Sequence, residues 1–211
     1  MLRRKLLTSF ATLLVTSGLS LSAIATDDAA LMLGVEYKQV PTPQLIAPHT
    51  KTVVEVFGYT CPHCYHLEPS LNAWLKNKPA DVNFERMPVV FNNPNWIFMA
   101  KVFYTAQELG VLEQSHEPFF DALHRDKKEL FTVEKIAEFF TQFDVKESDF
   151  IATFKGFKVD QLVRKAQKLT RDYGVEGVPA VIINGKYITD VGMTGSRDKL
   201  WQAVDTLSKQ Q

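Results

Sequence analysis

Apolar side chains gather in three short stretches in the first half of the chain. Residues 53–59 are mostly β-branched or aromatic, and apolar and polar side chains largely alternate along residues 82–87. Both patterns are typical of strands in a sheet. Residues 35–40 predict an earlier strand, which ends at Pro41.

A helix is expected directly after the strand at 53–59. Leu67, Leu71 and Trp74 recur at helical spacing, which predicts a helix over residues 62–76. Pro69 falls inside this helix. We expect a kink there, because proline removes one backbone hydrogen bond.

From Pro94 onward the period of the apolar positions changes from two to about 3.6, which predicts a block of helices. Gly110 is expected to end the first of them, and Gly174 the last. The helices between are expected to begin at Glu117-Pro118, after an N-cap at Thr132, after an N-cap at Ser148, and after Gly156. We expect the aromatic residues of this block to form a core rather than a cofactor site.

Strand periodicity returns near the C-terminus. Residues 179–183 and 186–189 flank Asn184-Gly185, and this dipeptide between two apolar runs predicts a β-hairpin. Ser196 can cap a final helix. The order of elements predicts an α/β protein in which one sheet domain is interrupted by an all-helical insertion.

This pattern divides the chain into four parts. Residues 26–93 and 167–211 are expected to form the sheet domain, and residues 94–166 the helical insertion. Residues 1–25 are typical of a cleaved signal peptide, because a basic start and an apolar run precede Ala23-Ile24-Ala25. An uncleaved membrane anchor is the alternative. Cleavage would give an exported protein.

The composition narrows the classes of function. The chain has 24 basic and 24 acidic residues, and loss of the predicted signal peptide would leave 21 basic ones. No basic stripe indicates binding to nucleic acid or to an anionic membrane. Two cysteines are too few to stabilise an exported domain through disulfides, so we expect their role to be chemical.

These cysteines, Cys61 and Cys64, lie where the strand at 53–59 turns into the predicted helix. A helix N-terminus stabilises a thiolate through its unpaired N–H groups and its dipole. Pro62 suits the first helical turn, where a missing N–H costs nothing. The pair can close into a disulfide or open to a dithiol, which predicts a redox-active site. We expect Cys61 to be exposed and acidic, and Cys64 to be protected.

A zinc site and a structural disulfide are the alternatives. Zinc needs four ligands, and the chain has only two cysteines. His63 and His66 are too close in sequence to complete an ordinary finger. Structural disulfides usually close longer loops. We therefore expect no metal, and no cofactor beyond the cysteine pair.

Two motifs resemble the DsbA family of periplasmic thiol–disulfide oxidoreductases. They are Phe57-Gly58-Tyr59-Thr60-Cys61-Pro62-His63-Cys64-Tyr65, and Gly177-Val178-Pro179-Ala180 followed by Asn184-Gly185-Lys186-Tyr187. The resemblance covers the whole chain after residue 25 and implies a thioredoxin fold with a helical insertion. Pro69 departs from the family pattern, and so does the loop at 188–196, which looks shorter and less apolar.

The resemblance also implies a reaction. An oxidised Cys61–Cys64 pair would donate its disulfide to folding exported proteins through a mixed disulfide at Cys61, and a DsbB-like membrane protein would reoxidise it. It implies a monomer in the periplasm. A reductase or isomerase of the same fold is one alternative, and a non-catalytic peptide-binding chaperone is another.

The second motif is implied to bind the substrate. Pro179 is expected to follow a cis peptide bond and to face the cysteines, while the backbone at Val178 pairs with a substrate peptide. Without the resemblance, a trans proline at the start of an edge strand would be the first expectation. Val178 matches the oxidising members of the family.

Other residues near the cysteines have two possible roles each. His63 can donate a hydrogen bond or place positive charge beside the Cys61 thiolate. Glu55 interrupts an apolar strand, and it can exchange protons with Cys64 through water or form an ion pair with Arg86. We expect Tyr59, Tyr65 and His66 at the rim of the site.

Overall fold

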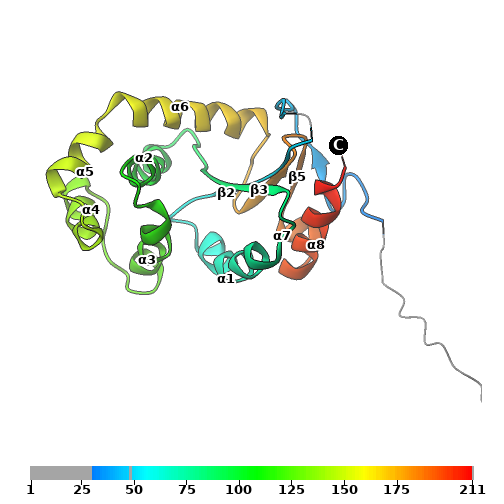
Figure 1. Cartoon of the computed structure of the whole chain (residues 1–211), viewed down its shortest axis with the longest axis horizontal. Helices are drawn as coiled ribbons and strands as arrows, with labels where there is room; N and C mark the ends of the chain where they lie inside the picture. The colour runs from blue at the N-terminus through cyan, green and yellow to red at the C-terminus, as the bar shows by residue number, and fades with distance from the viewer. Residues whose placement is uncertain (1–29, 48, 211) are drawn as a thin grey trace, which may run out of the picture. The chain divides into compact units, whose positions relative to one another are not determined.

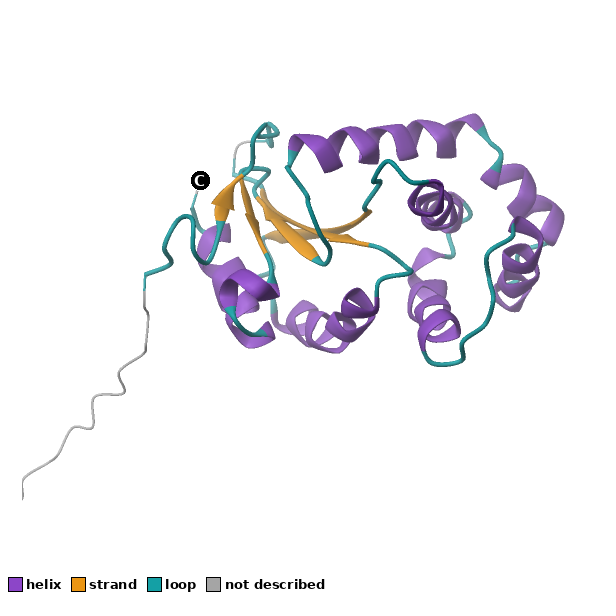
Figure 2. Cartoon of the chain, turned by 180° about the vertical axis from the view of Figure 1, so that it is seen from behind, coloured by secondary structure: helices purple, strands orange, loops and turns teal. Residues whose placement is uncertain are grey.

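The computed structural model describes residues 30–47 and 49–210, and Leu31–Gln211 form one compact unit. The predicted signal peptide lies outside the described residues. Within that unit a central sheet has helices on both of its faces (Figures 1 and 2). The chain thus has the mixed α/β architecture that its hydrophobic pattern predicts, with helices both before and after the predicted hairpin.

The sheet has five strands in the order β1-β5-β4-β2-β3. The strands are β1 (Lys38–Gln39), β2 (Lys51–Phe57), β3 (Val82–Pro88), β4 (Ala180–Ile183) and β5 (Tyr187–Thr189). The β2–β3 pair is parallel, and the other pairs are antiparallel. The strand predicted over 35–40 is therefore much shorter, because a turn in which the Gly34 N–H bonds to the Tyr37 carbonyl takes up its first half.

Helices occupy both sides of this sheet. They are α1 (Pro62–Asn77), α2 (Pro94–Glu108), α3 (Leu112–His124), α4 (Val133–Phe140), α5 (Glu147–Phe154), α6 (Phe157–Asp172), α7 (Val191–Thr194) and α8 (Arg197–Ser208), with a 3₁₀ turn at Thr141–Phe143. Figure 1 shows α6 above the sheet and α1 below it. The boundary predicted at residue 166 falls inside α6, which runs from the helical block back to the sheet.

Two helix starts differ from the prediction. The helix expected from Glu117-Pro118 begins at Leu112, so Pro118 lies inside α3. A proline leaves the carbonyl four residues earlier without its donor, and that residue, Gln114, is exposed, so water can satisfy it. The cap of α5 is Lys146 rather than Ser148. Thr132 and Ser196 cap their helices as predicted, and α1 continues through Pro69.

The core has two parts, one on each side of the sheet. The smaller one packs the sheet against α1 and α8, and its centre is a stacked pair of rings, Trp74 and Trp201, 5.1 Å apart. The larger one joins the sheet to the helices from α2 to α6. The inward side chains of α1 are therefore held against the sheet and α8, and its N-terminal end carries the cysteines.

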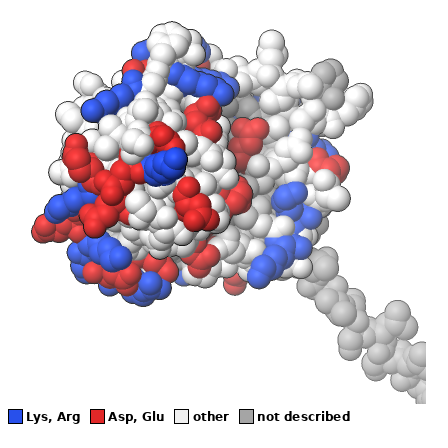
Figure 3. All heavy atoms as spheres, turned by 60° about the vertical axis from the view of Figure 1, so that its left-hand side comes forward, with Lys and Arg blue, Asp and Glu red and all other residues white. Residues whose placement is uncertain are grey.

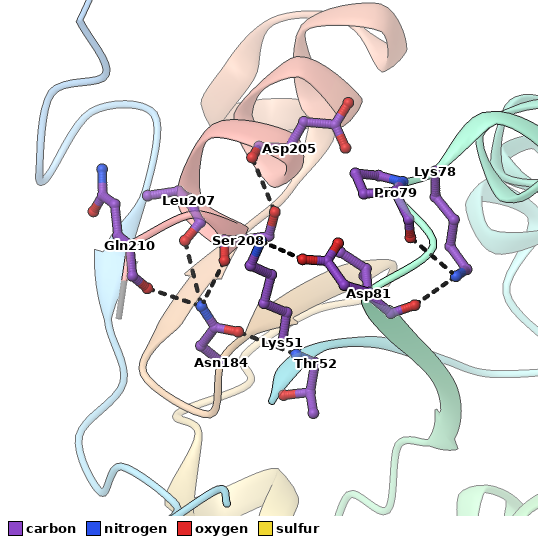
Figure 4. A network of polar contacts seen from close by, with 11 residues as sticks. Lys51, Thr52, Lys78, Pro79, Asp81, Asn184, Asp205, Leu207, Ser208 and Gln210 are labelled. Carbon is purple, nitrogen blue, oxygen red and sulfur yellow. Dashed lines mark hydrogen bonds and ion pairs between the residues drawn. The ribbon is translucent and has the colours of Figure 1, made fainter. Parts of the chain in front are cut away.

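Asn184 ties the end of the chain to the sheet (Figure 4). It sits in the β4–β5 turn with φ of 52°, a left-handed conformation that asparagine tolerates. Its amide N–H groups donate to the carbonyls of Ser208 and Gln210 at 3.2 and 2.9 Å, and its Oδ1 accepts from the Thr52 N–H at 3.1 Å. One turn residue thereby holds β2 and the C-terminal end of α8 together.

Charged side chains of both signs are intermixed on the face seen in Figure 3. Among the described residues, no helix is long and apolar enough to cross a membrane.

Candidate active site

Cys61 is the N-cap residue of α1, at the point where the loop after β2 turns into the helix. Its Sγ accepts a hydrogen bond from the Cys64 backbone N–H at 3.3 Å. Pro62 lies in the first helical turn, where no partner for its nitrogen is required. The local sequence therefore places a sulfur atom where the helix has backbone N–H groups without an intrahelical hydrogen-bond partner.

A second loop closes over this sulfur. The peptide bond between Val178 and Pro179 is cis, as the resemblance implies. The Val178 carbonyl accepts a hydrogen bond from the Cys61 thiol at 3.4 Å, although 117 residues separate the two. This contact exists because β4, which follows Pro179, pairs with β2, which precedes Cys61.

The loop covers the first cysteine more than the sequence predicts. Cys61 keeps only 8 % of its surface exposed, and Cys64 keeps none. Both are free thiols. An incoming sulfur can therefore reach Cys61 alone, and Cys64 is shielded.

The two thiols differ sharply in acidity. The pKa of Cys61 is lowered to about 6, first by the hydrogen bond from the Cys64 thiol and then by the backbone N–H groups of Cys64 and His63. Burial raises the pKa of Cys64 far above its usual range, and the neighbouring Cys61 adds to the effect. One thiolate at neutral pH is therefore expected, and it resides on Cys61.

His63 contributes less through its side chain than the sequence suggests. The residue is exposed, and its charge is the smallest of the five main influences on the Cys61 pKa, behind its own backbone N–H. The hydrogen bond from the Cys64 thiol and the backbone N–H groups at the helix start, rather than the imidazole, account for most of the acidity of Cys61.

Glu55 lies in the centre of β2 and is fully buried. Its Oε2 is 3.2 Å from Arg86 Nε, on the neighbouring strand, so the contact with Arg86 expected from the sequence is present, and it becomes an ion pair when Glu55 is ionised. The pKa of Glu55 is raised to about 8, because burial and the negative charge of Glu68 raise it more than Arg86 lowers it. At neutral pH this carboxyl holds its proton, so its second predicted role, proton exchange with Cys64, is chemically possible.

Two residues that the sequence reasoning missed complete this buried cluster. Arg86 Nη2 lies 3.1 Å from Glu68 Oε2, and His116 Nε2 lies 3.5 Å from Glu68 Oε1. Glu68 had a detectable signal, since it stands one helical turn after Cys64 on the inward face of α1. His116 had none, because only the packing of α3 against α1 brings it there.

The rim of the site also differs from the prediction. Tyr59 is buried rather than exposed, and its hydroxyl hydrogen-bonds His116 Nδ1 at 2.9 Å. Tyr65 does lie at the rim, where its hydroxyl donates to Asp121 at 2.8 Å and its ring stacks on His124. His124 Nε2 in turn binds the Tyr59 carbonyl at 2.7 Å. These contacts fasten the loop before Cys61 to α3.

Among the described residues, no group of three or more His, Cys, Asp or Glu side chains is arranged to hold a metal ion. The cysteines form a dithiol: one acidic sulfur lies at a helix start under a cis-proline loop, and one shielded sulfur follows a turn later. A thioredoxin fold that carries such a dithiol defines the class of thiol–disulfide oxidoreductases.

Comparison with known proteins places the chain within that class. The model of the DSBA-like thioredoxin domain matches residues 52–205. The thiol:disulfide interchange protein DsbA of Azotobacter vinelandii is 37 % identical over 203 residues, which cover 93 % of this chain and 94 % of the relative. The crystal structure of Pseudomonas aeruginosa DsbA, at 35 % identity, superposes with a TM-score of 0.79 and covers 85 % of this chain and 93 % of that one. The chain belongs to the DSBA-like thioredoxin family and is a thiol–disulfide oxidoreductase.

Proposed function

We propose that this protein is an exported dithiol oxidase that donates the Cys61–Cys64 disulfide to folding proteins. The observation that carries the proposal is the acidic Cys61 sulfur, which lies against the Val178 carbonyl with a pKa of about 6. A sulfur that is stable as a thiolate is a good leaving group, so its disulfide is readily given up.

The reaction has two exchanges. A substrate thiolate attacks Cys61 Sγ, the Cys61–Cys64 bond breaks, and Cys64 leaves as a thiolate that takes the proton of Glu55. A second substrate thiolate then attacks the substrate sulfur of the mixed disulfide, and Cys61 leaves as a thiolate. The substrate loses two electrons and gains a disulfide, and the enzyme becomes the dithiol seen in the structure.

Substrate is proposed to bind along the cis-proline loop, where Val178 and Pro179 are half-buried beside Cys61. A Proteus DsbA variant with a TM-score of 0.70 to this chain was solved with a non-covalently bound peptide, PWATCDS, which contains a cysteine. Backbone pairing of an extended peptide at Val178 would present its cysteine to Cys61. We further propose that the protein acts as a monomer in the periplasm and is reoxidised by a DsbB-like membrane protein.

The direction of exchange can be tested with a peptide that contains two reduced cysteines. The oxidised protein should convert it stoichiometrically to the peptide disulfide. Cys61→Ser should abolish the reaction, while Cys64→Ser, after activation of Cys61, should accumulate a mixed disulfide at Cys61. Net reduction of peptide disulfides by the dithiol form, with no oxidation by the disulfide form, would refute the proposal.

A further inference from the structure

The strand β3 forms one edge of the sheet, and a pocket of about 450 Å³ lies beside it. No further strand in the part of the chain that the structure describes pairs with this edge. The pocket wall comes from β3, α2 and α3, and it includes Phe84, Glu85, Arg86, Phe103, Leu112 and Glu113. Neither cysteine and no residue of the cis-proline loop belongs to this wall.

The backbone of β3 faces its neighbour β2 and the free edge in turn. The Val89 N–H donates to the carbonyl of Phe57, the last residue of β2, at 2.7 Å. Successive residues of a strand direct their N–H and C=O groups to opposite sides. Residues 83, 85 and 87 therefore face β2 as well, and residues 82, 84, 86 and 88 face the free edge.

Both ends of this edge are blocked, but its middle is not. Pro88 has no N–H to donate, and the Val82 carbonyl accepts a hydrogen bond from Lys78 Nζ. Proline and lysine commonly protect the edges of natural sheets. Between these two ends, the backbone groups of Phe84 and Arg86 have no hydrogen-bond partner among the described residues. Four backbone groups beside the pocket are thus available to a partner strand.

The exposed charges at the pocket are negative. The side chains of Glu85 on β3 and Glu113 on α3 are exposed. Arg86 is the cation of the wall, but its guanidinium already contacts Glu55 at 3.2 Å and Glu68 at 3.1 Å. A partner that brings lysine or arginine side chains to this edge is therefore favoured over an acidic one.

We infer that the free edge of β3 binds an extended, basic segment of a folding client protein by strand addition. The inference rests on the proposed function, in which clients are still unfolded when they meet this protein. The client strand would form up to four backbone hydrogen bonds with Phe84 and Arg86. Its basic side chains would lie beside Glu85 and Glu113, and its apolar ones would contact the aromatic rings of the wall. This second contact holds a part of the client that contains no cysteine.

A second copy of this chain fits the edge less well. Two β3 strands that pair in antiparallel fashion through both Phe84 and Arg86 are related by a two-fold axis at Glu85. The two Glu85 carboxylates would then lie directly opposite each other, and like charges in such a cross-strand pair are destabilising. A basic client strand meets the same carboxylate with the opposite charge.

Amide hydrogen exchange, measured by NMR on the wild-type reduced protein, tests this contact. The probe is a blocked, cysteine-free peptide of alternating lysine and valine at millimolar concentration. We expect the Phe84 and Arg86 amides to exchange about fivefold more slowly in its presence, because they gain hydrogen-bond partners. The Asn83 and Glu85 amides already face β2, so they are the internal control and should not change. A peptide with glutamate in place of lysine should protect neither Phe84 nor Arg86.

A charge reversal tests the chemistry of the partner. Glu113→Lys should reduce the affinity for the lysine peptide about fivefold. Glu117→Lys makes the same change one turn further along α3, outside the pocket wall, and is the matched control.

Three results would overturn the inference: unchanged exchange of Phe84 and Arg86, equal protection by both peptides, or a Glu113→Lys protein with wild-type affinity for the lysine peptide. The proposed oxidase function would fail in a different measurement. The wild-type protein would then not oxidise a two-cysteine peptide, whatever binds at β3.

Discussion

The acidity of Cys61 predicts how the stability of the two redox forms changes with pH. In the reduced folded protein the thiol has a pKa of about 6, against 9.0 for an ordinary thiol. In the oxidised protein this thiol does not exist. A depressed pKa stabilises the folded state fully above the unfolded value, and the stabilisation is lost as pH falls through the folded value. The free energy of unfolding of the reduced form should therefore increase relative to that of the oxidised form as pH rises.

The two pKa values set the size of the effect. The thiolate stabilises the reduced folded protein by less than about 0.1 kcal/mol at pH 5, by about 1.4 kcal/mol at pH 7 and by about 3 kcal/mol at pH 8.5. Water reaches part of this thiol, so screening makes these values upper bounds. The short loop closed by the disulfide favours the oxidised form by about 2 kcal/mol at every pH. The reduced form is thus expected to become the more stable one above neutral pH.

Denaturant unfolding of both forms at pH 5, 7 and 8.5 measures this difference. Glu55 also titrates in this range, but it is present in both forms, and the comparison between them removes most of its contribution. The difference in unfolding free energy between the two redox forms also determines the equilibrium constant with glutathione. A difference of 1.4 kcal/mol corresponds to about 30 mV. Equal stability differences at pH 5 and pH 8.5 would show that Cys61 has an ordinary pKa, and the argument for a strong oxidant would be lost.

Three further predictions concern single residues. Alkylation of the reduced protein at pH 6–7 should label Cys61 and spare Cys64, as mass spectrometry of tryptic peptides would show; equal labelling would contradict the assignment. His63→Ala should shift the glutathione equilibrium by less than about tenfold, or 30 mV, because the imidazole is the weakest of the main influences on the Cys61 pKa, and a larger shift would restore the side chain to the leading role. Glu55→Gln should stabilise the protein by up to about 3 kcal/mol at pH 7 in thermal or denaturant melts, because the raised pKa of Glu55, about 8, costs stability increasingly as pH rises above 4.5. The same variant should slow peptide oxidation, and a variant that is neither more stable nor slower would show that Glu55 is already ionised.

Local signals in the sequence were reliable wherever neighbours in the chain decide the structure. The strand before the cysteines, the Asn184-Gly185 hairpin and the caps at Thr132 and Ser196 all follow from residues a few positions apart. The same dependence on local signals explains why the start of α3 was predicted at the wrong residue. Its cap, Val111, makes no side-chain hydrogen bond, so no local mark competes with the proline inside the helix.

Contacts between distant elements were predictable only where a sheet relates them. Arg86 could be assigned to Glu55 because neighbouring parallel strands place them opposite each other. The contact between His116 and Glu68 depends on how α3 packs against α1, and no repeat in the sequence encodes it. The covering of Cys61 likewise depends on the approach of Val178 from the far end of the chain.

The strand order has a consequence for the biosynthesis of this protein. The cysteines lie on the segment after β2, but the loop that covers them precedes β4, which pairs with β2 only after the whole helical block has been made. Joining the two segments closes a loop of more than a hundred residues, which is entropically costly and slow to find. A chain that is synthesised from its N-terminus therefore exposes two thiols long before the loop that covers them has been made.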